Sequence, residues 1–339
     1  MKLFILTQAV DTNDPVLGFF HRWIEEFAKN VEQVTVICLK EGSHNLPENV
    51  KVLSLGKERG VSRLGYIYNF YTYITRERGN YDVVFVHMNQ IYVLLGGLLW
   101  RLWGKRASLW YAHGHVPFSL RVATLFAHAI VTSTESGFRI RTKKKHVVGQ
   151  GIDIKKFAPS EKKDDHPYTI ISVGRMSPVK DYETLIQAVA SLPDVRVLLV
   201  GGADTKEQEE YVKRLEKLVA EQGLSDRVSF VGSVPNHEVP RLLSESDLMV
   251  NTSHTGSLDK TMLEAMAMEV PVFTCNEAMR EVLGEYQDMF LFPKKDVASL
   301  AEKIRSYKDG DEDYGAQMRS IVAEHHTVEG LIKKILKYV

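Results

Sequence analysis

The chain has 339 residues, enough for about two domains, and its composition is that of a globular protein, with 44% hydrophobic and 25% charged residues. Its only cysteines, Cys38 and Cys275, each lie in a predicted strand, which argues against a disulfide framework and favours free thiols in a reducing cytosol. No segment offers the roughly 18 consecutive apolar residues of a membrane span. The nearest, residues 91–100, predicts a buried or interfacial helix.

The formal net charge is zero, but the charge is unevenly distributed. Residues 1–150 hold 19 basic and 11 acidic residues, a net charge of +8, and the remainder carries −8. This asymmetry indicates that the first half faces something anionic. Basic segments at 100–106 and 139–146 contribute to it, and Trp100 and Trp103 accompany the first as interfacial anchors would. We expect an anionic membrane surface or acceptor there and no nucleic acid; the alternative is a solvated basic face.

Short β-branched runs alternate with helical segments along the first half. The runs predicted as strands are LFIL, which is too short for a signal-peptide core, then VTVICL, DVVFVH, SLWYAH and AIVTS. DPVLGFFHRW predicts a helix after the first strand, with Pro15 in its first turn and Gly18 where a ligand or backbone can come close. His113 follows the strand SLWYA, at the position where open parallel sheets place their sites. The alternative for Gly18 is a glycine required only by packing, and the alternative for His113 is a purely structural histidine.

The same alternation continues after a segment rich in glycine, proline and charge, residues 149–167. The predicted strands are TIISVG, VRVLLVGG, RVSFVG, LMVNTS and VPVFTC. The pattern predicts an α/β fold with two doubly wound, Rossmann-like parallel-sheet domains. We expect an N-terminal domain over residues 1–150 and a second over 151–315. Residues 316–339 should form C-terminal helices, the last with an apolar stripe.

The segment SVGRMSPVKDYETLIQAV, residues 172–189, predicts an anion site. It takes the chain from a strand through Arg175 and Lys180 into a helix that Asp181 can cap. Unpaired N–H groups and the helix dipole favour an anion at such a terminus. Arg175 and Lys180 would add charge-assisted hydrogen bonds, so the site suits a phosphate or diphosphate.

A second loop of this kind follows the strand LMVNTS. Gly256 and Ser257 precede a predicted helix, and the N–H groups of Ser257 and Leu258 could hold a phosphate at its start. Glu264, about two turns in, could accept hydrogen bonds from a ribose diol. The alternative is that Lys260 and Glu264 form a surface ion pair at i, i+4 spacing.

Other chemistry is not supported by the motifs present. Asp309, Asp311 and Asp313 resemble the start of a calcium loop, but its twelfth position is Ser320 instead of glutamate. Histidine and cysteine show no zinc spacing. A GxGxxG after the first strand, a GxxxxGK[ST] loop and a G-x-S-x-G elbow are all missing. We therefore expect neither a metal nor a cofactor.

GRMSPVKDYETLIQAV resembles the corresponding segment of the retaining glycosyltransferases of family 4, the group 1 glycosyl transferases. The resemblance runs through LLVGGAD, RVSFVGSVPNHEVPRLLSESDLMV and LEAMAMEVPV and back to VVGQGIDIKKFAP. It is strong over residues 147–290 and softer before them. It implies the GT-B fold, in which two Rossmann-like domains face each other across a cleft, with the last helix crossing back to the N-terminal domain.

The resemblance also assigns roles to residues. Arg175 and Lys180 would clamp the donor diphosphate, Glu264 would hold the ribose, and Val234 would seat the base through its backbone. It further implies that Gly18 lines the diphosphate from the facing domain and that His113 lies near the transferred sugar. Gly256, Ser257, Leu258 and Asp259 would complete the donor loop.

One position departs from the family pattern. The family carries two glutamates eight positions apart, the first of which contacts the sugar. In this chain the second is Glu264, but the position of the first is occupied by Gly256. Asp259 could substitute for it, or the sugar could be held differently. The identity of the donor sugar, and to a lesser degree activity itself, therefore stays open.

The expected function is a metal-independent retaining glycosyltransferase that moves a sugar from a nucleotide diphospho-sugar to a glycan or lipid-linked acceptor. We expect it in the cytoplasm, with peripheral attachment to the inner face of the membrane. Two alternatives remain: an isomerase resembling a nucleotide-sugar 2-epimerase, and a non-catalytic protein that binds a nucleotide-sugar or glycan.

Overall fold

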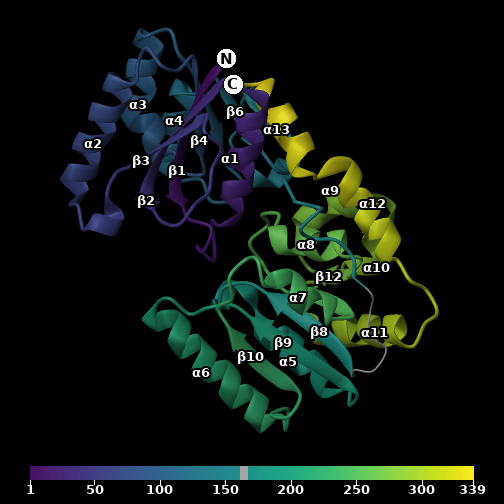
Figure 1. Cartoon of the computed structure of the whole chain (residues 1–339). Helices are drawn as coiled ribbons and strands as arrows, with labels where there is room; N and C mark the ends of the chain where they lie inside the picture. Colours follow the sequence, from purple (N-terminus) through teal and green to yellow (C-terminus); the bar gives the residue numbers. More distant parts are fainter. Residues whose placement is uncertain (161–166) are drawn as a thin grey trace. The chain divides into compact units, whose positions relative to one another are not determined.

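A computed structural model describes residues 1–160 and 167–339 and divides the chain into two compact units (Figure 1). Unit 1 comprises Met1–Gly151 and Val328–Val339, and unit 2 comprises Ile152–Thr327. The charged stretch 161–166 of the predicted interdomain segment lies outside the described residues.

Unit 1 is built on a seven-stranded sheet in the order β3-β2-β1-β4-β5-β6-β7, in which neighbouring strands run parallel. Its strands are β1 (Lys2–Val10), β2 (Gln33–Glu41), β3 (Val50–Ser54), β4 (Val83–His87), β5 (Arg106–Trp110), β6 (Ala129–Thr132) and β7 (Lys145–Val147). A sheet buried on both faces needs apolar residues at successive positions, which explains the near-continuous hydrophobic runs in the sequence.

Helices cover both faces of this sheet. Alternate residues of β1 enter opposite cores: Leu3 and Ile5 pack with α1 (Phe19–Asn30) and α13 (Val328–Leu336), whereas Phe4 and Leu6 pack with the helices of the other face. Those helices are α2 (Arg63–Arg76), α3 (Ile91–Leu102) and α4 (Phe118–Phe126). Short 3₁₀ turns, η1 (Lys57–Arg59) and η2 (Glu135–Gly137), complete the unit.

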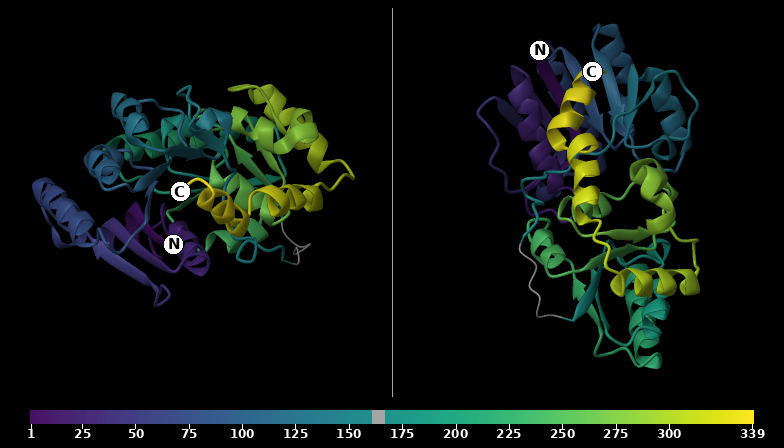
Figure 2. Two further views of the ribbon diagram at one scale, coloured as in Figure 1. Left: turned by 90° about the horizontal axis from the view of Figure 1, so that it is seen from above. Right: turned by 90° about the vertical axis from the view of Figure 1, so that its right-hand side faces the viewer.

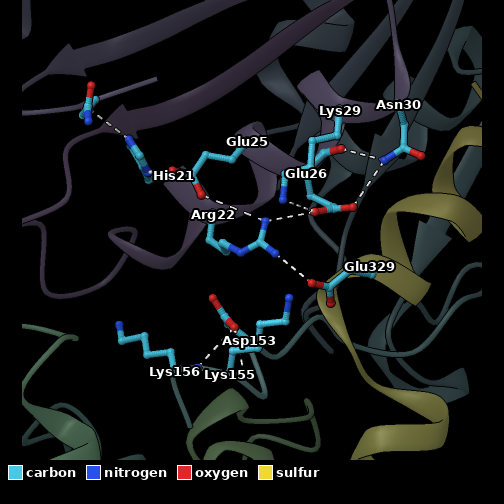
Figure 3. Close-up of polar contacts among 11 residues, drawn as sticks. His21, Arg22, Glu25, Glu26, Lys29, Asn30, Asp153, Lys155, Lys156 and Glu329 are labelled. Atoms are coloured by element: carbon cyan, nitrogen blue, oxygen red, sulfur yellow. Dashed lines mark hydrogen bonds and ion pairs between the residues drawn. The ribbon is translucent and has the colours of Figure 1, made fainter. Parts of the chain in front are cut away.

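The C-terminal helix α13 is held to α1 by a polar cluster as well as by its apolar stripe (Figure 3). Arg22 Nη1 donates to Glu26 Oε2 at 3.0 Å, and Arg22 Nη2 donates to Glu329 Oε1 at 2.7 Å. Lys29 also donates to Glu26, at 3.1 Å. Because α13 completes unit 1, the two chain ends lie close together there, as Figures 1 and 2 show.

Unit 2 is built on a five-stranded parallel sheet in the order β10-β9-β8-β11-β12. Helix α5 packs on α6 and α11, and α8 packs on α12. The strands are β8 (Tyr168–Val173), β9 (Val195–Val200), β10 (Val228–Gly232), β11 (Leu248–Asn251) and β12 (Val272–Thr274). The helices are α5 (Tyr182–Ala190), α6 (Lys206–Glu221), α7 (Val239–Ser244), α8 (Lys260–Ala267), α9 (Arg280–Leu283), α10 (Gln287–Phe290), α11 (Val297–Lys308) and α12 (Gly315–His325), with 3₁₀ turns η3 (Pro178–Lys180), η4 (Glu277–Met279) and η5 (Gly284–Tyr286).

The predicted fold class, two doubly wound parallel-sheet units, is confirmed. The predicted C-terminal segment 316–339 divides between the units, with α12 in unit 2 and α13 in unit 1. Among the described residues, no helix is long and apolar enough to cross a membrane.

Two local predictions are wrong. The first helix begins at Phe19 instead of near Pro15, because the Asp14 carboxylate accepts from the N–H groups of Val16 and Leu17 and holds residues 14–17 in a turn. Trp100 is not an interfacial anchor. It is fully buried, and its indole N–H donates to the Tyr81 hydroxyl at 3.1 Å.

Candidate functional site

The predicted site residues on the loops after β8 and β11 lie at the topological switch point of the unit 2 sheet. From β8 the chain winds outward through β9 to β10, then returns to β11 on the other side of β8. The loops after β8 and β11 therefore start from neighbouring strand ends, at the place where the winding of the chain reverses direction. Open α/β sheets bind ligands in the crevice that such loops leave.

The loop after β8 owes its shape to glycines. Gly201, at the end of β9, has φ +158°, and a Cβ there would lie 1.8 Å from the Gly174 carbonyl oxygen. A Cβ on Gly174 would meet Lys180 Cε at 3.0 Å and Nζ at 3.3 Å. The buried Tyr182 donates its hydroxyl to the Gly174 carbonyl at 2.8 Å. The Lys180 ammonium is thereby folded back over the end of β8.

The two loops are fastened to each other at several points. Lys180 Nζ lies 2.6 Å from Asp259 Oδ2, and both side chains are largely buried, at 14% and 20% exposure. Thr252 donates its hydroxyl to the Lys180 carbonyl at 2.6 Å, and the His254 N–H donates to the Val179 carbonyl at 3.0 Å. These contacts hold the two loops together within the free chain.

Helix α8 begins at this crevice with its N-terminus uncapped. Asp259 occupies the N-cap position, but its side chain makes no capping hydrogen bond because the carboxylate accepts from Lys180 and Asn251. Gly256 takes a left-handed conformation, with φ +66°, in the turn that precedes the helix. Ser257 and Leu258 are both buried beside it. The positive end of the helix dipole thus lies beside the Lys180–Asp259 ion pair.

Glu264 is buried, at 4% exposure, so the surface ion-pair alternative for it is wrong. Burial raises the pKa of Glu264, although the nearby charges of Lys260 and Lys156 and a hydrogen bond from Asn236 oppose that rise. Burial also disfavours the charged form of Lys260 and therefore lowers the pKa of that group. Lys156 Nζ lies 2.5 Å from Asn236 Oδ1. A buried carboxylate among amide and ammonium donors can accept hydrogen bonds from hydroxyl groups of a ligand.

Arg175 and Val234 lie at the edges of this arrangement. Arg175 is exposed, and among the described residues its guanidinium has no hydrogen-bond partner. Val234, in the loop after β10, is half-buried against the unit 2 core.

The predicted residues of unit 1 lie at the carboxyl edge of its own sheet. Gly18 immediately precedes α1, and a Cβ there would lie 2.7 Å from the Asp14 carbonyl oxygen and 2.9 Å from that of Thr12. Backbone packing alone therefore requires this glycine. His113 is exposed after β5, and its Nδ1 accepts from the His115 N–H at 2.9 Å. Its Nε2 atom is consequently the one available to carry the proton.

Sequence reasoning missed two contributors to the unit 2 site. His254 Nε2 lies 3.0 Å from Asp181 Oδ2, and Thr184 donates its hydroxyl to the same carboxylate at 2.8 Å. Asp181 consequently occupies the N-cap position of α5 without capping it. Lys156 was missed because it precedes Glu264 by more than a hundred residues in the sequence. The signal for His254 was the polar run NTSH, residues 251–254, at the end of β11. In residues 1–160 and 167–339, no three His, Cys, Asp or Glu side chains gather as a metal site requires.

Two Rossmann-like α/β units, the second with a pair of fastened loops at the switch point of its sheet, are what a protein of the GT-B class consists of. Family models agree with this. "Glycosyl transferases group 1" matches residues 153–321, and "Glycosyl transferase 4-like" matches residues 13–131. The chain belongs to the group 1 glycosyltransferases.

Individual relatives match only parts of the chain. A D-inositol 3-phosphate glycosyltransferase from Mycobacterium sp. (strain KMS) is 31% identical over 134 residues, which are 37% of this chain and 30% of that protein. A 2-deoxystreptamine glucosyltransferase from Streptomyces kanamyceticus is 29% identical over 153 residues, 44% of this chain and 38% of that one. The chain thus matches less than half the length of these curated relatives.

The fold is matched along the whole chain. The crystal structure of Anabaena Alr3699/HepE in complex with UDP superimposes with a TM-score of 0.80, covering 99% of both chains, at 19% sequence identity. The predicted GT-B fold is therefore confirmed.

Proposed function

We propose that this chain is a retaining glycosyltransferase that uses a nucleotide diphospho-sugar as its donor. The observation that carries the proposal is the fastened pair of loops at the unit 2 switch point. There, Lys180 folds over the end of β8 beside the uncapped N-terminus of α8. Family membership and the UDP bound by the HepE protein support the same donor class.

The chemistry follows from where charge develops. Glycosyl transfer passes through an oxocarbenium-like state, and negative charge grows on the departing diphosphate. Fixed cations and backbone amides stabilise that charge without reorganising. We assign Lys180, Arg175 and the N–H groups of Ser257 and Leu258 to the diphosphate, Glu264 to the ribose, and Val234 to the base. Gly256 and Asp259 would complete the donor loop.

His113 is proposed to orient or polarise the transferred sugar, and Gly18 to approach the diphosphate. The acceptor would be a glycan or a lipid-linked glycan. A lipid-linked acceptor would require the chain to reach an anionic membrane surface, the inner face in a cytoplasmic setting. The +8 charge of residues 1–150 agrees with that requirement.

The proposal assigns to protein cations the role that a divalent ion has in other glycosyltransferases. Excess chelator should therefore leave the rate of transfer unchanged. The measurement is turnover with and without chelator after exhaustive dialysis. A large loss that manganese restores would contradict the metal-independent part of the proposal.

The decisive experiment is a thermal-shift screen over UDP-, GDP-, ADP- and TDP-sugars, because a ligand that binds the folded state raises its stability. The donor that binds is then incubated alone and with candidate glycan acceptors. Transfer to an acceptor with the donor's anomeric configuration supports the proposal. An epimerised sugar from donor alone would favour an isomerase. Tight binding without turnover on any acceptor would favour a binding protein, the outcome that Gly256 makes worth testing.

A further inference from the structure

The net positive charge of the first half comes from one segment. Residues 1–82 hold ten basic and ten acidic residues, whereas residues 83–146 hold nine basic residues and a single acidic one, Glu135. The whole excess of +8 therefore belongs to the segment that contains α3 and α4. Within it, residues 83–134 include neither aspartate nor glutamate.

Helices α3 and α4 lie side by side and form one surface. A Cβ on Gly97 would lie 2.7 Å from Phe126 Cβ, so the helices approach closely at that glycine. At one end of the pair, Gln90 Nε2 donates to Ser119 Oγ at 2.9 Å. At the other, Arg101 donates to the carbonyl oxygens of Leu125 and Phe126, at 2.6 and 3.2 Å.

Exposed apolar side chains run along both helices of this surface. On α3, Ile91, Leu98 and Leu102 are spaced seven and four residues apart, so they share one side of the helix. On α4, Phe118 and Leu125 are seven residues apart. Their exposed fractions are high: Ile91 42%, Leu98 56%, Leu102 72%, Phe118 79% and Leu125 66%. We name these five residues the α3–α4 face.

Cations border the α3–α4 face. Arg101 and Arg121 are exposed between its apolar residues. Lys144 Nζ donates to the carbonyl oxygens of Thr124 and Ala127, at 2.9 and 2.8 Å, so the C-terminal end of α4 presents ammonium and guanidinium groups where a helix would otherwise present partial negative charge. The face thus combines exposed leucines with charge of one sign.

We propose that the α3–α4 face docks onto an anionic lipid bilayer, with its apolar side chains in the headgroup boundary and its cations on lipid phosphates. Amphipathic surfaces with basic and large apolar residues bind membranes in this way without spanning them. A second copy of the chain fits poorly, because a symmetric contact would bring two positive faces together. The inference rests on the membrane contact in the proposed function and names the face that would make it, but it does not depend on the donor site.

The test is co-sedimentation of the full chain with phosphatidylcholine vesicles that either contain or lack phosphatidylglycerol, in the absence of donor and acceptor. The wild-type chain should bind the anionic vesicles, and less so at high salt. The combined variant Leu98→Ser, Leu102→Ser, Leu125→Ser should weaken binding about tenfold or more. Arg121→Glu alone should weaken it about tenfold.

The matched control is Leu64→Ser with Tyr68→Ser on α2, two apolar residues that are 79% and 73% exposed but lie outside the face. That control should bind like the wild type. All variants should unfold at the same temperature as the wild-type chain. Failure of the wild type to bind anionic vesicles would overturn the proposal, as would undiminished binding by both face variants. So would a wild-type dimer that the leucine variant converts to monomer, because a second copy would then cover the face.

Discussion

Among the described residues, Arg175 has no hydrogen-bond or ion-pair partner, whereas Lys180 has one. Lys180 is neutralised by Asp259 at 2.6 Å, so replacing it would disturb structure and function together. The guanidinium of Arg175 is exposed, and within the described residues it makes no hydrogen bond. An effect of removing it would therefore report on a ligand.

Arg175→Ala should leave the free energy of unfolding within about 0.5 kcal/mol of the wild type, as is usual at exposed positions. Transfer from the donor should fall about 10²- to 10³-fold if the group stabilises the departing diphosphate. The measurements are chemical denaturation and steady-state turnover. Arg196→Ala, at an exposed position of β9, is the matched control and should change neither. A normal rate in Arg175→Ala would remove the role assigned to this residue.

Glu264 marks the limit of sequence reasoning at this scale. Its position in a helix after a glycine-serine loop predicted a ribose-binding carboxylate, yet the same spacing from Lys260 also fitted a surface ion pair. Only the burial of α8 decides against the second reading, and burial depends on the packing of α8 against α12. The contribution of Lys156, from before β8, had no local signal.

The donor loop, as an element, depends on a close approach between the ends of β8 and β9. Gly201→Ala would place a Cβ 1.8 Å from the Gly174 carbonyl oxygen, at a φ of +158°. The loop carrying Arg175 and Lys180 must then shift, so nucleotide affinity should fall at least tenfold. Calorimetric titration measures this. Gly202→Ala, whose nearest contact would be Ser233 Cβ at 3.1 Å, should have a smaller effect. Equal affinities in both variants would contradict the proposed site.

The ion pairs of Glu26 within α1, one of them with the Arg22 that also binds Glu329 of α13, should make unit 1 sensitive to acid. Burial alone would raise the pKa of Glu26, but hydrogen bonds from Lys29 and Arg22 outweigh burial and lower it below its usual 4.5. A carboxyl group with a lowered pKa stabilises the fold above its unfolded pKa and loses that contribution as the pH falls through the folded value. The free energy of unfolding should therefore decline below about pH 4.5.

Glu26→Gln removes the charge but keeps the shape, and it should cost about 2 kcal/mol at neutral pH. It should also flatten the acid dependence, because the titrating group is gone. Denaturation between pH 3 and pH 7, followed by tryptophan fluorescence, checks both. Glu32→Gln, with a side chain 64% exposed, is the control. A Glu26→Gln variant that loses stability in acid as steeply as the wild type would exclude this carboxylate as the cause.

Elements were more predictable than their ends. Apolar runs flanked by turn residues identified the described strands except β3 and β7, because a parallel sheet buried on both faces demands such runs. Strands β3 and β7 form the two edges of the unit 1 sheet and are only partly buried, so their sequences carry no apolar run. The start of α1 was misplaced because an aspartate such as Asp14 can begin a turn as readily as a helix. Trp100 was misjudged because the side of α3 that packs inward depends on Tyr81, a residue outside the local pattern.

For the whole molecule, the sequence predicted two Rossmann-like units from two sets of alternating strands and helices. It did not predict where the C-terminal segment would divide, because α12 and α13 both have apolar stripes that could pack on either unit. Contacts decide: α13 joins α1 in the unit 1 core, and α12 packs on α8.

The distribution of tryptophan makes the two units separately observable. All four tryptophans, Trp23, Trp100, Trp103 and Trp110, belong to unit 1, so their fluorescence follows the unfolding of that unit alone. Circular dichroism follows both units. A nucleoside diphosphate at about 100 times its Kd stabilises whatever binds it by about 2.7 kcal/mol. If the ligand binds unit 2 alone, the unfolding transition of unit 2 should move to higher temperature. Circular dichroism detects that transition, whereas tryptophan fluorescence does not.

The same experiment tests Gly18, for which mutation is uninformative. Any side chain there would collide with the carbonyl oxygens of Asp14 and Thr12, so a loss of activity in Gly18→Ala would not distinguish packing from ligand contact. If Gly18 approaches the diphosphate, the ligand binds unit 1 as well, and the tryptophan-monitored transition should rise with ligand concentration. A fluorescence transition that stays constant while the other one rises would remove Gly18 from the donor site and leave it as a packing glycine.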